Sequence, residues 1–550
     1  MKKQSKALFT LASLAIVMSM LLAACSGATP APATQAAPTQ APATEVPKEK
    51  PTIVIALDSD IDHIEPMQFR SLGAYHATAN LYEPLVMQKL VPDDKGNLIG
   101  QNTFEGAGAE TYEVSPDGMT FTFHLRKNAK FADGTPITAN DYRYTFERAM
   151  KGPGYIGLLT GFFALESMDQ IKVVDDYTLQ LTTKRPSALT EVVLSFQVLG
   201  AMSEATGKAH ATEKDPYADE WTHTNANPSG PYIITEWKPG VQYTFEPNPN
   251  YWRGPDYFGS KKIVFRVVPD ASTREQLLRS GDVDIALGIP FKDLAELKKD
   301  ANIEIHAVPT TRVYHVGMNV KKKPFDDVRV RQAVSMVVPY DAIVQNVIYG
   351  FGKNPKSPVG DGMPTHDESF FTFDKKTVDD AKKLLADAGY PDGFEVELTV
   401  PQEDQARVDS ATWVQSGLEK IGVKVKVNAL PTAQYSDLLN SHELPMYIFE
   451  WFSWGNDPFF QFTWNFKCEA FTNFANYCNP ELDKIIDQGI YTRDEAEREK
   501  LSKQAQEMIV NDAVWIYLYQ PDWVVATRKG VSGIALFNDL NLHFAYLQKK

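Results

Sequence analysis

The segment from residue 394 to residue 430 constrains the fold of this chain more than any other stretch. Residues 394–400 alternate apolar and polar side chains, a pattern that predicts a half-buried strand. Apolar residues then recur at helical spacing up to Ile421, Gly422 ends the helix, and residues 423–430 return as a strand. A strand, a helix and a second strand in this order predict a βαβ unit and an α/β fold.

Strand and helix signals alternate along the rest of the chain from residue 51 onward. Residues 53–57 and 119–125 alternate as strands do. Thr138 and Asp141 have the spacing of a capping box, which predicts a helix that begins there. Thr377 is a candidate N-cap of a further helix. The whole segment therefore favours the α/β class.

The composition indicates a large, acidic, globular protein. Hydrophobic residues make up 43% of the 550 residues, and 30 Phe, 23 Tyr and 9 Trp argue against a mostly disordered chain. The 55 basic and 70 acidic residues give a net charge of −15. A nucleic-acid partner is not expected, because phosphate contacts need an excess of Lys and Arg.

The first 24 residues predict an export signal. Three lysines among the first six residues precede an apolar stretch over residues 7–22, which is too short and too polar for a spanning helix. The stretch ends in Leu22-Ala23-Ala24-Cys25, which resembles the lipoprotein box of bacteria. This resemblance implies a signal peptide over residues 1–24 and lipidation of Cys25. The alternative is an ordinary signal peptide with an incidental cysteine.

Residues 25–50 are expected to form a tether rich in Pro, Ala and Thr. At roughly 3.1 Å per residue, the proline-rich part at residues 28–50 holds a domain up to about 70 Å from a membrane. No later segment contains 18 consecutive apolar residues. The expected location is therefore extracytoplasmic, with a lipid anchor in the cell membrane, on the periplasmic or cell-surface side.

Six motifs resemble those of one protein family and occur in the family's order. They are YEPL at 82–85, the run from Tyr112 to Arg148, NPSGPY at 227–232, NPNYW at 248–252, SGDVD at 280–284 and DVRVRQA at 327–333. They are similar to motifs of the extracytoplasmic solute-binding proteins of oligopeptide, dipeptide and nickel ABC transporters, family 5. The resemblance covers residues 51–550. Most of these residues also have simple structural roles; Asp327 and Arg331, for example, are spaced to pair at a helix start.

The resemblance implies a fold of the periplasmic-binding-protein type II kind, with two hinged lobes and an extra domain inserted in the first. The boundaries expected from the motifs are 51–90, 225–310 and 515–550 for lobe I, 91–224 for the extra domain and 311–514 for lobe II. The implied activity is capture of a solute by closure of the lobes. The expected partners are the solute, the permease subunits of an ABC importer and, through the lipid, the membrane. We expect a monomer.

The segment from Glu450 to Pro458 resembles a ligand-binding segment of the family. Its candidate binding residues are Trp451, Trp454, Asn456 and Asp457. Trp454 stands where the family usually has an aspartate that pairs with the free amino end of a peptide. Arg70, next to Phe69, stands where oligopeptide binders have an acidic pocket residue. Three tyrosines, Tyr155, Tyr517 and Tyr519, match pocket aromatics of the family or otherwise belong to the core.

Loss of an anionic group and gain of a cation predict a neutral or anionic ligand, such as an oligosaccharide, a modified peptide or an opine-like compound. The alternative is that Asp457 or Glu450 supplies the carboxylate and that peptides bind as usual.

Motifs for covalent chemistry, nucleotide binding and metal binding were not found in the sequence. There is no Gly-x-Ser-x-Gly, no phosphate-binding loop and no His-Glu-x-x-His. We therefore expect no cofactor, no metal and no enzymatic activity, and a structural role for His315. With Cys25 lipidated, Cys468 and Cys478 remain as a pair in an exported protein, which predicts a disulfide between them.

The sequence thus favours a membrane-tethered solute-binding lipoprotein of an ABC importer. Two hypotheses from other functional classes stay open. An extracellular hydrolase with a pair of carboxylates would turn over its ligand, and a ligand sensor for a membrane receptor would lack neighbouring genes for two permeases and two ATPases.

Overall fold

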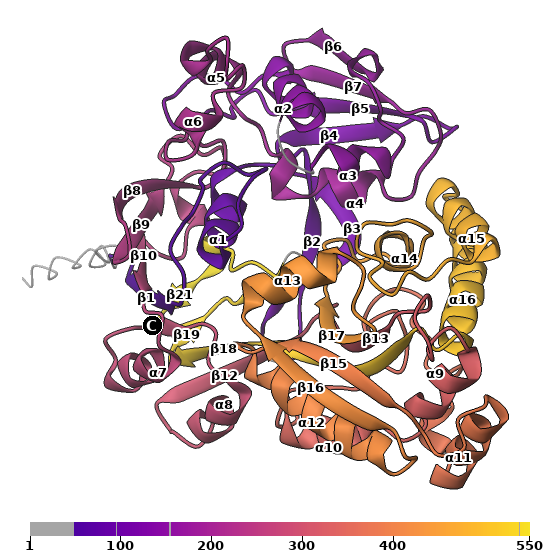
Figure 1. Ribbon diagram of the computed structural model, residues 1–550. Coiled ribbons are helices and arrows are strands. Elements are labelled where there is room, and N and C mark those ends of the chain that lie inside the picture. The colour runs from indigo at the N-terminus through magenta and orange to yellow at the C-terminus, as the bar shows by residue number, and fades with distance from the viewer. Residues whose placement is uncertain (1–48, 95, 153–155, 538–539) are drawn as a thin grey trace, which may run out of the picture. The chain divides into compact units, whose positions relative to one another are not determined.

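The longest strand, β18 (Trp515–Arg528), runs through the middle of a 12-stranded mixed sheet in the computed structural model (Figure 1). Its first half pairs with β13 (Val313–Met318), and its second half pairs with β12 (Ile303–Pro309) and β11 (Ile285–Ala286). All these pairings are antiparallel. Residues 515–521 are all buried, as expected for a strand that is covered on both faces. The structure describes residues 49–94, 96–152, 156–537 and 540–550.

On one side of β18 the sheet continues through the predicted βαβ unit. The strands are β17 (Met446–Trp451), β15 (Glu395–Pro401) and β16 (Lys424–Leu430). β15 and β16 are parallel, and α12 (Gln405–Glu419) connects them, so the prediction is confirmed. Gly422 has a φ of +81°, a left-handed conformation that suits glycine after a helix end.

On the other side the sheet continues through β1 (Thr52–Leu57), β10 (Lys262–Val267), β9 (Gln242–Pro247) and β8 (Tyr232–Lys238). β1 pairs in parallel with β10 and β11, whereas β10, β9 and β8 are antiparallel neighbours. The short β14 (Gly352–Lys353) also pairs with β18. One sheet therefore links segments from both ends of the described chain.

A separate four-stranded sheet lies within the segment predicted as the inserted domain. Its order is β4 (Ala109–Val114), β5 (Thr120–Leu125), β7 (Thr178–Thr182) and β6 (Ile171–Asp175). α2 (Ala139–Lys151) packs on it and begins with the predicted capping box, in which N and Oγ1 of Thr138 both donate to Asp141 Oδ2 at 2.8 Å. A third sheet contains β2 (Val86–Pro92), β3 (Leu98–Gly106) and β20 (Ala535–Leu536), and β19 (Val531–Ser532) pairs with β21 (Gln548–Lys549).

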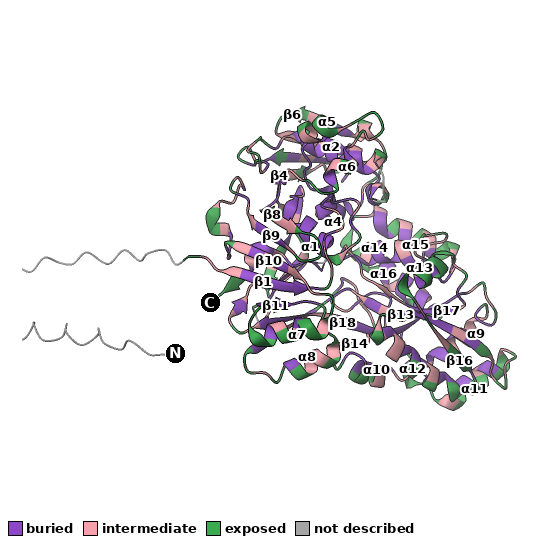
Figure 2. Ribbon diagram, turned by 60° about the vertical axis from the view of Figure 1, so that its left-hand side comes forward, coloured by how far each residue is buried: buried purple, intermediate pink, exposed green. Residues whose placement is uncertain are grey.

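The remaining helices cover these sheets, and Figure 2 shows buried strands between exposed helix faces. In the first half of the chain they are α1 (Leu72–Leu81), α3 (Gly157–Gly161), α4 (Thr190–Leu194), α5 (Glu204–His210), α6 (Asp219–Thr222), α7 (Ala271–Ser280) and α8 (Phe291–Leu297). In the second half they are α9 (Val328–Ser335), α10 (Tyr340–Asn346), α11 (Val378–Asp387), α13 (Thr432–Asn440), α14 (Pro458–Asn465), α15 (Pro480–Tyr491) and α16 (Glu495–Asn511). Short 3₁₀ turns are η1 (Met168–Gln170), η2 (Gln197–Leu199), η3 (Pro255–Tyr257), η4 (Phe373–Lys375) and η5 (Phe544–Tyr546). Among the described helices, none has the length and apolar character needed to cross a bilayer.

The predicted pair between Asp327 and Arg331 is wrong. Asp327 is the N-cap of α9, accepts a hydrogen bond from the backbone N of Arg329 and forms an ion pair of 2.5 Å with the Arg329 side chain. Arg331 is buried and donates to the carbonyls of Asp512 and Phe325 at 2.8 and 2.7 Å. The N-cap geometry places the carboxylate over the first turn, and burial directs Arg331 toward carbonyl groups. Thr377 is the N-cap of α11, as predicted.

Candidate functional site

Two adjoining cavities lie where β17 ends and its side chains emerge from the core. The aromatic cavity has a volume of about 460 Å³ and the charged cavity about 1060 Å³. They share Phe449, Phe471 and Thr472 as lining residues. An apolar space is thus continuous with a polar one, the usual composition of a small-molecule site.

The loop from β17 to α14 is held in place by contacts with distant segments. Thr311 Oγ1 donates to the carbonyl of Ser453 at 3.0 Å. A Cβ atom at Gly455 would lie 2.5 Å from Cγ1 of Val192, so a larger residue would push the loop off its support. Asp457 is the N-cap of α14 and accepts from the backbone N of Phe459 at 2.9 Å. These contacts fix the direction of the aromatic side chains on either side of the loop.

Aromatic side chains form most of the wall of the aromatic cavity. The ring centroids of Trp451 and Trp464 lie 6.1 Å apart, and those of Phe460 and Trp464 lie 6.3 Å apart. The remaining lining residues are Leu158, Leu159, Phe449, Glu450, Phe452, Trp454, Phe471 and Thr472.

An ion-pair cluster contributes lining residues to both cavities. Glu450, which is half-buried, lies 3.3 Å from Arg312 Nε through Oε2 and 3.3 Å from Arg407 Nη2 through Oε1. Arg407 Nε also lies 2.9 Å from Oδ2 of Asp404, the N-cap of α12. Burial raises the pKa of Glu450, but Arg312 and Arg407 outweigh it and hold that pKa below its ordinary value. Glu450 is therefore ionised at neutral pH.

The Nε donors of the two arginines are buried, so a ligand would meet their other guanidinium N–H groups. The Nε groups of Arg312 and Arg407 are buried in ion pairs that give them no well-directed hydrogen bond. A guanidinium carries five N–H donors. Arg312 and Arg407 line the charged cavity, so acceptor oxygens of a ligand can reach them.

The structure brings two of the predicted site residues together and places two others elsewhere. Trp451 and Trp454 both line the aromatic cavity. Asn456 lies in a different cavity, of about 700 Å³, and its Oδ1 is buried without a partner. Asp457 is buried and forms an ion pair of 2.7 Å with Arg498. Asp457 and Glu450, the two carboxylates considered for a ligand amine, are thus both neutralised by arginines.

Phe69 and Arg70 differ in their position relative to the site. Phe69 is buried with its ring centroid 5.0 Å from that of Tyr75, and Tyr75 stacks 6.2 Å from Trp454. Phe69 therefore supports the wall from behind. Arg70 is exposed, its backbone N donates to Asp62 at 2.9 Å, and it lines neither cavity.

Tyr517 and Tyr519 belong to the core of the sheet. Both are at most 1% exposed, and the Tyr519 ring stacks on Tyr314 with centroids 4.7 Å apart. Neither lines the two cavities. Tyr155 and Cys25 lie outside the described residues, as do the signal peptide and most of the tether.

The loop between Cys468 and Cys478 supplies part of both cavities. The two Sγ atoms lie 2.08 Å apart, in a disulfide. Phe471 and Thr472 lie within this loop, and Phe471 is 64% exposed. The disulfide therefore closes a loop that contributes side chains to the site.

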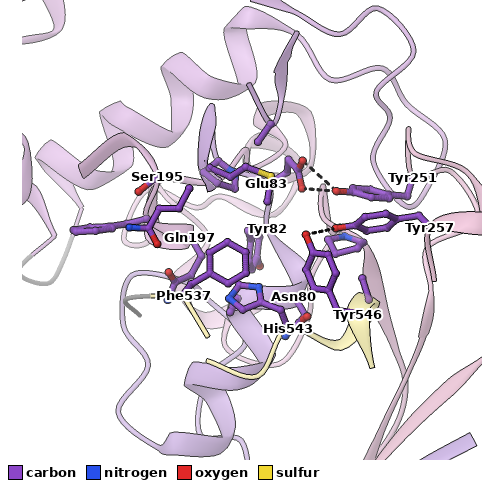
Figure 3. A pocket seen from close by; sticks show the side chains of 18 of the residues that line it. Asn80, Tyr82, Glu83, Ser195, Gln197, Tyr251, Tyr257, Phe537, His543 and Tyr546 are labelled. Carbon is purple, nitrogen blue, oxygen red and sulfur yellow. Dashed lines mark hydrogen bonds between the residues drawn. The ribbon is translucent and has the colours of Figure 1, made fainter. Parts of the chain in front are cut away.

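A fourth cavity, of about 80 Å³, is also lined by Trp454 and is called the inner cavity below. Figure 3 shows its polar wall, in which Tyr251 donates to both oxygens of Glu83 at 3.0 and 3.2 Å, and Tyr257 and Tyr546 share a hydrogen bond of 3.1 Å. Burial raises the pKa of Glu83 above its ordinary value, although nearby donors and arginines oppose this. Trp454 lines both this cavity and the aromatic one.

His315 has a structural environment. It is 1% exposed, its ring lies 3.5 Å from that of Trp515, and burial lowers its pKa to about 3. Within the described part of the chain, no group of three or more His, Cys, Asp or Glu side chains has the arrangement of a metal site.

Sequence motifs identified the two tryptophans but missed most other lining residues, of which four are instructive. Arg312, Arg407, Leu158 and Phe471 come from four separate segments and meet only in the folded chain. Nothing in the local sequence marks Arg312, Arg407 or Leu158. Phe471 alone had a signal, because it lies between the two cysteines that form the disulfide.

These features define a class of protein. An α/β fold in which one long strand joins two groups of strands, beside adjoining apolar and charged cavities, is that of a type II periplasmic binding protein. The chain belongs to the bacterial extracellular solute-binding proteins, family 5, because the family model described as "family 5 Middle" matches residues 103–473.

Individual relatives cover nearly the whole chain. The probable D,D-dipeptide-binding periplasmic protein DdpA of Escherichia coli is 28% identical over 507 residues, which are 90% of this chain and 93% of that protein. Heme-binding protein A of Haemophilus influenzae is 29% identical over 439 residues, 76% of this chain and 79% of that protein. The structure of the periplasmic binding protein DppA of Helicobacter pylori with the peptide STSA has a TM-score of 0.77 at 25% identity, and covers 90% of this chain and 98% of that one.

Proposed function

We propose that the chain is a lipoprotein that captures an oligopeptide or a similar small solute outside the cytoplasm and delivers it to the permease of an ABC importer. The observation that carries the proposal is the junction of the aromatic and charged cavities beside Arg312 and Arg407. A peptide combines apolar side chains with a polar backbone and a carboxylate, so it suits both spaces. The names of the relatives, which include binders of a dipeptide and of the peptide STSA, support a peptide-like solute.

Capture is proposed to occur by closure of two lobes around the solute. The chain passes twice between the two groups of strands, at residues 310–312 and at residues 520–522. These two segments form the proposed hinge. Thr310 Oγ1 donates to the carbonyl of Pro521 at 2.7 Å, which ties the two crossings together. A solute that contacts both sides favours the closed form through the contacts made only there. The mechanism involves no covalent step.

The polar end of the solute is proposed to be recognised as an anion or an acceptor. Glu450 and Asp457 are already paired with arginines, whereas Arg312 and Arg407 line the charged cavity. A carboxylate of the solute can therefore accept from the guanidinium groups, with the strength of charge-assisted bonds. This agrees with the neutral or anionic ligand predicted from Trp454.

Calorimetry with three forms of one tripeptide, Ala-Phe-Ala, tests this assignment. N-acetylation is expected to change Kd by less than about threefold, and C-terminal amidation to raise it by at least about tenfold, because amidation removes a charge-assisted bond. Arg407→Lys should weaken the free acid and not the amide, whereas Arg70→Ala, the exposed control, should leave both unchanged. Loss of binding on acetylation instead would show that an amine is recognised. Binding of oligosaccharides or opines but of no peptide would favour the alternative ligand class.

The anchor and the transporter are separate parts of the proposal. Cys25→Ser should move the protein from the membrane fraction to the soluble exported fraction, and unchanged membrane association would contradict lipidation. Genes for two permeases and two ATPases are expected beside the gene for this chain, and their absence would favour a sensory role.

A further inference from the structure

The aromatic cavity is incomplete at its rim. Leu158 in α3 is 58% exposed and Phe471 in the disulfide loop is 64% exposed, and both line this cavity from different segments of the chain. Large apolar side chains that remain open to water at the same cavity mark a surface that an apolar partner covers. Because the cavity continues into the charged cavity, the group that covers it belongs to the same solute.

The aromatic cavity has little capacity for hydrogen bonding. Thr472 Oγ1 already donates to the carbonyl of Trp464 at 2.6 Å, and Glu450 is held between two arginines. Trp451 Nε1 and Glu450 Oε2 are the buried polar atoms of the described lining that make no hydrogen bond, so the indole N–H is the one donor among them that an acceptor could use. A polar group placed here would lose its water without gaining partners, which is costly. An apolar group gains free energy in proportion to the area it buries.

Trp454 is the partition between the aromatic cavity and the inner cavity. It lines both, and it is held edge-to-face against Phe196 at 6.0 Å and stacked on Tyr75 at 6.2 Å. Beyond it, the inner cavity adds about 80 Å³ and is lined by polar side chains such as Gln197, which is 6% exposed. Removing the indole would join the two spaces.

We propose that the aromatic cavity binds a bulky aromatic group of the solute and that Trp454 sets the upper limit on the size of this group. The proposal rests on the proposed function, since it assumes that the charged cavity binds the polar part of the same molecule. It narrows the solute class to amphipathic, peptide-like molecules with a ring system at one end. Trp454 is a specificity-determining residue in this account.

Calorimetry with a series of tripeptides Ala-X-Ala tests the size limit. X is alanine, phenylalanine, 2-naphthylalanine or 4-biphenylalanine, and 2-naphthoate serves as a probe without a peptide. The wild-type protein should bind the phenylalanine or naphthyl member at least about tenfold more tightly than the alanine member, and should bind the biphenyl member more weakly than the naphthyl member. Trp454→Ala should improve the biphenyl member relative to the phenylalanine member by at least about tenfold. Trp454→Phe keeps a smaller ring, so its preference for the biphenyl member should lie between those of the wild-type protein and Trp454→Ala.

Two controls separate specificity from damage to the fold. Trp221→Ala removes a tryptophan that stacks on His210 at 4.2 Å and lines neither the aromatic nor the inner cavity, so it should leave the series unchanged. Thermal unfolding of each variant shows whether it is folded. If Trp454→Ala does not fold, the size limit is tested with Trp454→Phe alone.

The outcomes distinguish this inference from the proposed function. Peptides that bind with equal affinity whatever X is, or a biphenyl member unaffected by both Trp454 variants, overturn the inference and leave the proposed function intact. Binding of 2-naphthoate that depends on Trp454, without binding of any peptide, overturns the peptide assignment and supports the aromatic cavity. Failure of every probe overturns both.

Discussion

The buried carboxylate of Asp457 lies 2.7 Å from the guanidinium of Arg498, which is partly exposed. Oδ1 of the same aspartate caps α14, the helix that follows the site loop. A residue in a family binding motif thus holds the loop in place and does not line either cavity of the candidate site.

Asp457→Asn should destabilise the protein without weakening ligand binding. Asparagine keeps the capping oxygen and removes the charge, so Arg498 is left without its counterion. We expect the free energy of unfolding to fall by about 2–3 kcal/mol, measured by urea denaturation. Asp494→Asn is the matched control, because Asp494 caps α16 at an exposed position and should lose less than about 1 kcal/mol. Equal losses in the two variants would contradict a role for the ion pair.

Glu450→Gln should lower stability in a manner that depends on pH. The pKa of Glu450 is lower in the folded than in the unfolded state, so its contribution is complete above the unfolded-state pKa and is lost as the pH falls through the folded-state pKa. We expect a loss of about 1–2 kcal/mol near pH 7, because the group is only half-buried. The difference from wild type should shrink as the pH falls below the ordinary pKa of a glutamate. A difference that is constant with pH would show that the charge is not the cause.

His315 should make the folded protein sensitive to mild acid. Its folded-state pKa of about 3 lies below the unfolded value of about 6.5, so the unfolded state binds the proton first as the pH falls. The contribution is therefore complete above about pH 6.5 and is lost between there and about pH 3, by at most about 1.4 kcal/mol per pH unit. His315→Leu should flatten the stability profile over this range. His124→Leu, at an exposed site, controls for the loss of a histidine, and an equal flattening in it would contradict the prediction.

Replacing both Cys468 and Cys478 by serine should affect stability and binding together. Opening a loop of this length is expected to cost about 2–3 kcal/mol, because the unfolded chain regains conformational freedom. The loop carries Phe471 and Thr472, so ligand affinity should also fall. Reduction and alkylation, followed by mass spectrometry, checks that the wild-type thiols are bridged. Unchanged affinity in a folded double variant would show that the loop contributes no contact to the ligand.

Local sequence patterns predicted much of the fold. The βαβ unit around α12, the capping box at Thr138 and the N-cap at Thr377 depend on residues a few positions apart, so their patterns are visible in the sequence. The pairing of Asp327 with Arg331 was wrong because burial of Arg331, a tertiary effect, directs it to Asp512 and Phe325. The boundaries of the lobes stay predictions.

The site could be predicted only in part. Trp451 and Trp454 follow one another along a single loop, so one motif revealed both. Arg312 reaches the site from the crossing before β13 and Arg407 from α12, and neither segment has a pattern that indicates a binding role. Tyr517 and Tyr519, chosen by family position, are in the core because β18 is covered on both faces. Arg70 is exposed because its segment is anchored through its backbone to Asp62.

The central claim is that the chain holds a small solute and does not transform it. Native mass spectrometry of the exported protein, purified gently from its own cells and again after unfolding and refolding, tests this claim most directly. We predict one small molecule bound to each protein chain, released on unfolding, able to rebind after refolding and unchanged in mass after prolonged incubation with the protein. A protein that carries no molecule and binds none of the peptides or the aromatic probe, or a molecule whose mass changes during incubation, would contradict the account.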